Sequence, residues 1–176
     1  MKRLATWGVV VAGGIGWWLA QTAMAQSVGQ LDQMFVQKAA SSGLAGVQLG
    51  KMAMERAASA EVQQFGQRMV DAHTQTNNEL LAIAQIKRIP VTKVLDTHYQ
   101  IVVQRLAALR GPEFVRVYMV GQVADHEQAV TLFVTEATEG QDPDLKAFAA
   151  KLLPVLQAQK RTAYALTTRL QDRRTQ

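Results

Sequence analysis

The stretch SAEVQQFGQRMVDAHTQTNNELLAIAQIKR, residues 59–88, decides the fold because its apolar residues recur every three or four positions. The residues that this spacing places on the inward face are Val62, Phe65, Met69, His73, Thr76, Leu80 and Ile83. Ser59 is a suitable N-cap, and Pro90 ends the helix because proline disfavours the α conformation in the residue before it. The pattern therefore predicts a long amphipathic helix from Ala60 to Arg88.

Four further segments show the same helical period, and no segment shows the alternation typical of a strand. These segments cover residues 32–58, 96–109, 112–139 and 142–170. The first contains Gly43, Gly46 and Gly50 along its inward seam, which would let a neighbouring helix approach closely. Pro154 lies inside the last segment and predicts a kink there. Four long helices and one short helix with brief connections predict an all-α, antiparallel four-helix bundle over residues 32–171.

The N-terminus, residues 1–25, has the three parts of a secretory signal peptide: a basic start, an apolar run and the small-x-small sequence Ala23-Met24-Ala25. We therefore predict cleavage between Ala25 and Gln26, which leaves a short linker over residues 26–31, and export to a bacterial periplasm. An uncleaved membrane anchor is the alternative. The apolar run of about 17 residues is at the lower edge of the length that spans a bilayer, which favours cleavage.

The composition excludes several classes of function. The chain has 176 residues and no cysteine, so it has no disulfide, no thiolate metal site and no cysteine nucleophile. Removing Lys2 and Arg3 with the signal peptide changes 19 basic residues to 17, so the mature net charge is 17 − 14 = +3. Such a small excess gives no reason to expect nucleic-acid binding. We expect no membrane insertion after cleavage; the basic polar tail, residues 172–176, favours solubility, with contact to an anionic envelope surface as the alternative.

Two histidines are the candidate ligands for a metal ion. They lie in the related sequences Met69-Val70-Asp71-Ala72-His73 and Val123-Ala124-Asp125-His126-Glu127, and both share a helix face with apolar residues. Imidazole and carboxylate are ligands for Zn, Fe, Mn or Cu, and bundle interiors hold such sites. The spacing differs from the Glu-x-x-His of ferritin-type centres, and residues two apart on a helix do not face each other.

The simpler interpretation of His73 and His126 is a pair of core histidines whose ring nitrogens bond to neighbouring groups. On that interpretation Asp71 points to solvent, because His73 points inward. His98, near the start of the short helix, is expected at the surface.

Several short motifs follow one another in a defined order between Phe35 and Leu170. They are Leu49-Gly50-Lys51, Phe65, Arg68-Met69-Val70-Asp71-Ala72-His73, Glu113-Phe114, Tyr118-Met119, Asp125-His126, Asp142-Pro143 and Leu153-Pro154. In this order they resemble a family of exported bacterial proteins, filed as a domain of unknown function and often labelled outer membrane protein. The resemblance implies a ferritin-like bundle and residence in the periplasm or at the outer membrane, and it brings no established reaction.

The chain departs from that family at positions that bear on metal binding. Relatives often carry acidic residues where Gly46 and Gln48 stand, a second acid in place of Ala72, and a histidine in place of Gln159. Such residues would be natural ligands, so the resemblance implies an incomplete ligand set here.

The sequence as a whole predicts an exported periplasmic helical bundle that is not an enzyme and has no resident cofactor. Its role would be structural, stress-related or one of interaction in the cell envelope, and its small-residue seams would allow self-association. The alternative is a metal-binding or redox-active ferritin-like protein that uses His73 and His126 with Asp71 and Asp125.

Overall fold

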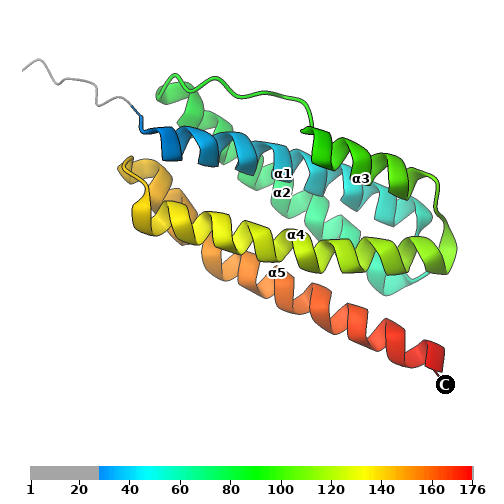
Figure 1. The fold of residues 1–176 in the computed structure, drawn as a ribbon. Helices are drawn as coiled ribbons and strands as arrows, with labels where there is room; N and C mark the ends of the chain where they lie inside the picture. Colours follow the sequence, from blue (N-terminus) through cyan, green and yellow to red (C-terminus); the bar gives the residue numbers. More distant parts are fainter. Residues whose placement is uncertain (1–27, 176) are drawn as a thin grey trace, which may run out of the picture.

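The computed structural model describes residues 28–175 and shows helices joined by short connections (Figure 1). Within that range the helices are α1 (Gln30–Arg56), α2 (Ala60–Ile86), α3 (Thr97–Ala107), α4 (Gly111–Glu139) and α5 (Pro143–Thr175). The prediction of an all-α bundle with one extra short helix is confirmed. None of these helices is long and apolar enough to cross a bilayer. The predicted signal peptide and its cleavage site between Ala25 and Gln26 lie outside the described residues.

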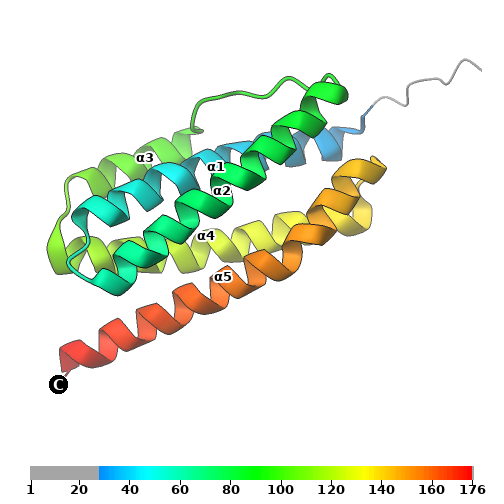
Figure 2. The ribbon, with the colours of Figure 1, turned by 180° about the vertical axis from the view of Figure 1, so that it is seen from behind.

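Local sequence explains the start of α3 and the length of α5. Asp96 caps α3, because its side chain accepts a hydrogen bond of 3.0 Å from the backbone N–H of Tyr99. Helix α5 continues through Pro154, and Figure 2 shows its axis changing direction along its first half. It also continues to Thr175, since no glycine or proline follows Leu170 to stop it. Residues 172–175, predicted as a polar tail, are therefore helical.

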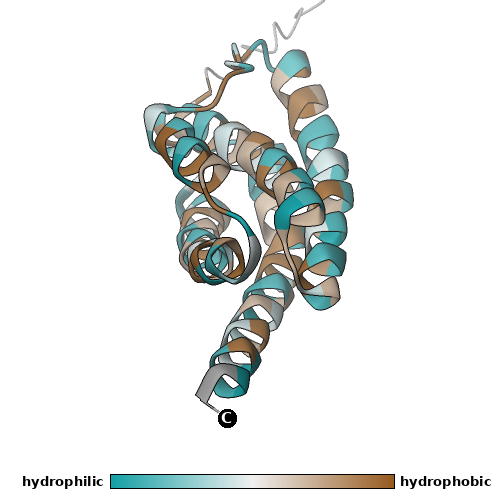
Figure 3. Cartoon of the chain, turned by 90° about the vertical axis from the view of Figure 1, so that its right-hand side faces the viewer, coloured by the Kyte–Doolittle hydropathy of each residue, from teal (hydrophilic) through white to brown (hydrophobic). Residues whose placement is uncertain are grey.

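The four long helices form two antiparallel hairpins. Helix α1 packs along α2 and helix α4 packs along α5, while the hairpins meet mainly through α1 and α4 (Figures 1 and 2). Helix α3 lies across the outside of α1 and α4. Helices α2 and α5 touch only slightly, and the C-terminal end of α5 points away from the other helices (Figure 3). This divergence opens a groove that is described below.

Helices α1 and α2 cross closely because each has a glycine at the crossing. A Cβ atom added to Gly66 would lie 2.6 Å from the backbone oxygen of Gly50, and one added to Gly50 would lie 2.7 Å from the oxygen of Gly66. Both distances are too short for a side-chain carbon, so the two backbones pack directly against each other. The seam of small residues predicted for the first helix is confirmed.

The core consists of two apolar clusters, one toward each end of the bundle. The first is built around Phe65, Phe114 and Tyr118, and the second around Phe35, Phe133 and Phe148. Between them is a layer with many polar side chains: Ser42, His73, Gln122, Asp125, His126 and Gln159. Burying polar groups costs free energy unless they find partners, so this polar layer is the candidate functional site.

Candidate functional site

His73 and His126 lie next to each other in the polar layer, and each comes from a different hairpin. His73 comes from α2 and His126 from α4, and their ring centroids are 6.3 Å apart with the ring planes inclined by 55°. Each helix presents its histidine inward because the neighbouring positions on the same face, Met69 and Met119, belong to the buried core. The structure therefore brings together two side chains that are 53 positions apart in the sequence.

His126 is held in one orientation and has a free lone pair. Its Nδ1 lies 2.7 Å from the backbone oxygen of Gln122, which can only accept, so Nδ1 carries the proton and donates it. The other nitrogen, Nε2, is buried and has no hydrogen bond of normal geometry, but the side chain of Gln159 interacts with the ring and raises its pKa. Burial lowers the pKa of His126, against the opposing effects of Gln122 and Gln159, so the ring is neutral with its lone pair on Nε2.

His73 sits against the backbone of α1. A Cβ atom at Gly46 would lie 2.3 Å from Cδ2 and 2.5 Å from Nε2 of His73, so the ring occupies the space that a side chain at position 46 would fill. Burial, with a smaller effect from His126, lowers the pKa of His73 to about 4. Gly46 therefore has a second role besides the close packing of α1 and α2, because its missing side chain leaves the space that the imidazole ring of His73 occupies.

A small cavity lies between the two rings and α3. It has a volume of about 20 Å³ and is lined by both histidines together with Ser42, Tyr99 and Asp125. A second cavity of about 30 Å³ adjoins it on the other side of His73. A water-sized occupant needs roughly 10–15 Å³ of such space. The first cavity is therefore the size of a single water molecule or metal ion.

The two aspartates predicted as ligands have different positions. Asp125 lines the same cavity, and burial raises its pKa to about 6, partly offset by His98. Asp71 does not reach the cavity, and the expectation that it joins the site is corrected. It is exposed, and its Oδ1 accepts a hydrogen bond of 2.8 Å from Gln67 instead, since residues two apart face different sides of a helix. Among residues 28–175, no three His, Asp or Glu side chains come close enough to hold a metal ion together.

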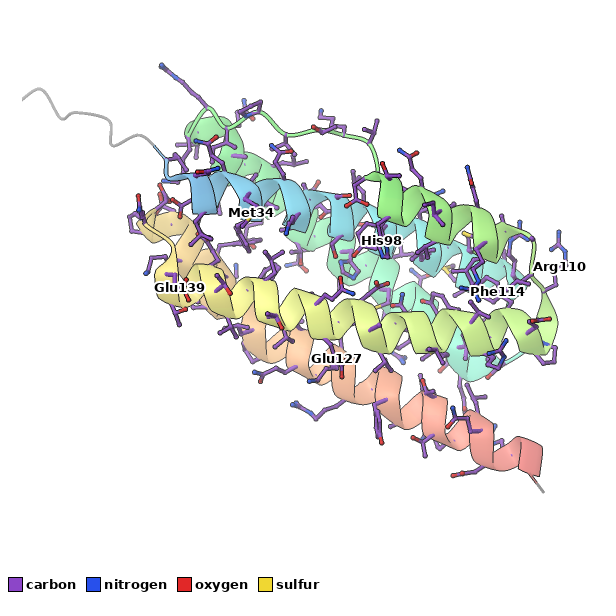
Figure 4. The ribbon with its side chains drawn as sticks, viewed as in Figure 1. Met34, His98, Arg110, Phe114, Glu127 and Glu139 are labelled. Carbon is purple, nitrogen blue, oxygen red and sulfur yellow. The ribbon has the colours of Figure 1, made fainter. Side chains whose placement is uncertain are left out.

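Two residues of the site were not foreseen, Tyr99 and Gln122, whereas position 159 was singled out only through the resemblance to the family. Gln122 precedes His126 by four positions, and this helical spacing is the signal that could have pointed to it. Tyr99 closes the cavity from α3, where no periodic pattern links it to the histidines. His98, expected at the surface, is exposed beside it, and Figure 4 shows it at the start of α3 above α4.

A second buried polar cluster joins the start of α1 to the loop between α4 and α5. Both oxygens of the fully buried Asp32 carboxylate accept backbone hydrogen bonds of 2.9–3.1 Å, from Gly29, Gln141 and Asp142. Burial alone would raise the pKa of Asp32, but these bonds and the neighbouring Glu136 lower it. Glu136 is 1% exposed, and burial followed by its contact with Asp32 raises its pKa to about 8. At pH 7 the raised pKa keeps Glu136 protonated beside the ionised Asp32, although the Glu136 oxygens form no hydrogen bond of normal geometry.

This carboxyl pair predicts that stability falls with rising pH. The folded-state pKa of Glu136 is above its unfolded value of 4.5, so its contribution is complete below that value and is lost as the pH rises through about 8. Asp142 acts in the same direction and Lys146 opposes it. From pH 7 to pH 9 we expect the free energy of unfolding to fall by about 1 kcal/mol, measured by urea denaturation.

Two variants separate the effect of Glu136 from the titration of other ionisable groups over the same pH range. Glu136→Gln keeps a neutral donor of the same shape, so its unfolding free energy should stay level over the same pH range. Glu139→Gln changes an exposed glutamate on the same helix and should retain the slope of the wild type. An equal slope in Glu136→Gln and wild type would contradict the assignment of the buried proton.

Comparisons with known proteins agree with the fold. A family model described as a domain of unknown function (DUF4142) matches residues 19–166. The crystal structure of a DUF305 fragment from Deinococcus radiodurans superposes with a TM-score of 0.71 at 14% sequence identity, covering 81% of this chain and 98% of that one. At that identity the likeness shows the fold alone. A search of curated proteins gave no match.

Proposed function

The chain belongs to the DUF4142 family, whose description assigns no biochemical role, and we propose from the geometry that it is a non-catalytic metal-binding bundle exported to the bacterial periplasm. The ion would be held between His73 and His126. The proposal rests on the site and on the predicted signal peptide.

The lone pair of His126 carries the proposal. Its Nε2 is buried without a hydrogen bond of normal geometry, with Gln159 as a neighbouring polar group, while Nδ1–H is anchored on the backbone oxygen of Gln122. Metal-ligating histidines typically have this arrangement, in which the second nitrogen donates to a carbonyl and fixes the ring. Two imidazoles on one ion, with metal–nitrogen distances of about 2.0–2.1 Å, place their ring centroids roughly 5–6.5 Å apart. The separation of 6.3 Å between the two rings lies at the upper end of this range, which corresponds to a nearly linear pair of ligands. A tetrahedral ion would therefore draw the rings about 1 Å closer.

The surroundings favour an ion that accepts nitrogen ligands. Imidazole suits Zn, Cu and Fe better than it suits hard ions such as Mg or Ca. With two protein nitrogens, the other positions would be taken by water. The cavity of about 20 Å³ would hold the ion, and the adjoining cavity of about 30 Å³ has room for about two water molecules. The side chains of Asp125 and Gln159, which line the adjoining cavities, would bond to those water molecules. A cavity of about 20 Å³ leaves no room for an organic substrate, which supports binding rather than catalysis.

A structural role in the cell envelope is the second candidate. The same cavity volume fits one ordered water molecule that would satisfy His126, and the polar layer would then only fix the packing of the two hairpins. Association with the outer membrane and self-association belong to this candidate and stay predictions.

Metal titration of the mature chain, starting at Gln26, separates the two candidates. We expect one equivalent of Zn²⁺ or Cu²⁺ per chain, measured by competition with a chromophoric chelator. His73→Phe and His126→Phe each remove one of two ligands, so each should weaken binding at least 100-fold while circular dichroism stays helical. His98→Phe removes an exposed imidazole and should bind as the wild type does. Equal binding by all four proteins would assign the metal to another place, and no binding would favour the structural role.

A further inference from the structure

The groove left by the divergence of α2 and α5 is a second candidate site, far along the bundle from the Asp32 cluster. This α2–α5 groove has a volume of about 540 Å³ and is formed by the start of α2, the start of α4 and the end of α5. Its apolar lining includes Ala58, Pro112, Val115, Met119, Val120 and Leu170. The volume falls in the range of small-molecule sites, about 300–1,000 Å³.

The wall of the groove is apolar where a soluble helix would usually be polar. Val120 is 51% exposed on α4, whereas Val115 and Met119 beneath it are buried. The C-terminal end of α5 points away from the other helices (Figure 3), and Val120 is half exposed in the groove. The groove therefore has an exposed apolar wall against which an extended alkyl chain could pack.

The charged residues that line the groove are two arginines and one glutamate, a formal charge of +1, and two helix N-termini lie beside them. Helices α2 and α4 both begin here, and neither N-cap, Ser59 or Arg110, makes a side-chain capping hydrogen bond. Their backbone N–H groups and helix dipoles therefore favour an anion at this end. Arg116 and Arg173 also line the groove.

One acidic residue, Glu61, lines the groove as well, and it is paired with a cation. Arg173 Nη2 lies 3.2 Å from Glu61 Oε1. Arg116 lies 3.6 Å from Glu113 on the same helix and is half exposed. Exposed pairs of this kind are weak, so either arginine can turn to a bound anion at little cost.

We propose that the α2–α5 groove binds a single-chain anionic amphiphile of the fatty-acid type. The alkyl chain would lie along the exposed apolar residues Ala58, Pro112 and Val120, and the carboxylate would lie at the two helix N-termini beside Arg116. This site does not involve His73 or His126, so the proposal stands independently of metal binding.

Isothermal titration of the mature protein with octanoate, decanoate and dodecanoate below their micellar concentrations tests the apolar part. Each added methylene should tighten binding about two- to fourfold until the groove is filled. Decanol, which has the same chain without the charge, should bind at least tenfold more weakly than decanoate. No binding of dodecanoate at millimolar protein, or equal affinity for decanoate and decanol, would overturn the proposal.

A matched pair of variants tests the location. Val120→Glu puts a carboxylate into the apolar wall at an exposed position and should weaken dodecanoate binding at least tenfold. Val134→Glu makes the same change on the same helix at a residue that is 41% exposed and lies outside the groove, so it should bind as the wild type does. Arg116→Gln should weaken decanoate binding and leave decanol binding unchanged. Equal affinity in Val120→Glu and Val134→Glu would place the amphiphile elsewhere and contradict the proposal.

Discussion

Replacing Asp32 by alanine should lower the free energy of unfolding by about 3–5 kcal/mol, because it removes the acceptor for buried backbone donors and leaves Glu136 without its partner. The N–H groups of Gly29, Gln141 and Asp142 all donate to this one carboxylate. No water can replace it without opening the contact between the start of α1 and the loop that joins α4 to α5, since Asp32 is fully buried. Urea denaturation at pH 7 measures the loss.

Two further variants define the origin of that loss. Asp32→Asn keeps the size and one oxygen acceptor, so it should lose about half as much, since neutral hydrogen bonds are roughly half as strong as charge-assisted ones. Asp144→Ala removes an aspartate whose side chain is 68% exposed and pairs with Lys87, and it should cost less than about 1 kcal/mol. A loss below 1 kcal/mol for Asp32→Ala would show that Asp32 does not join the two segments.

Gly66→Ala and Gly121→Ala should have opposite effects, although the chemical change is the same. At Gly66 the added carbon meets the backbone oxygen of Gly50 and the side chain of Ala53, so α1 and α2 must move apart. We expect a net loss of about 2–3 kcal/mol from this overpacking, even though alanine favours a helix. At Gly121 no atom lies within 4 Å of the added carbon, so alanine should gain about 1 kcal/mol of helix propensity.

Thermal and urea denaturation of both variants measure this difference of about 3–4 kcal/mol. Equal stability of Gly66→Ala and Gly121→Ala would contradict the direct backbone contact between α1 and α2. Gly50→Ala, which meets the same crossing from the other helix, should behave like Gly66→Ala.

The helices could be predicted from sequence because each carries its own signal. The spacing of apolar residues by three and four around Phe65 indicates a helix, and Gly140 indicates where a helix ends. Both signals come from residues that are close together in the chain. The same local pattern placed His73 and His126 on inward faces. The end of α5 was missed because nothing after Leu170 marks a stop, and an open end leaves a helix free to continue.

The chemistry of the sites could be predicted only in part, because it depends on pairs that are distant in the chain. Asp32 and Glu136 are 104 positions apart, and each looks like an ordinary acidic residue in its own helix. The contact between Gly46 and His73 depends on how closely α1 approaches α2, which no local pattern reports. Gln159 reaches His126 from α5 for the same reason.

Anomalous diffraction from crystals of the mature protein grown with Zn²⁺, recorded at the zinc absorption edge, tests the proposed metal site most directly. We expect one strong peak between the rings, about 2.0–2.1 Å from Nε2 of His126 and from a ring nitrogen of His73. A water molecule in that position without anomalous signal, or zinc bound only at surface residues, would contradict the proposed site.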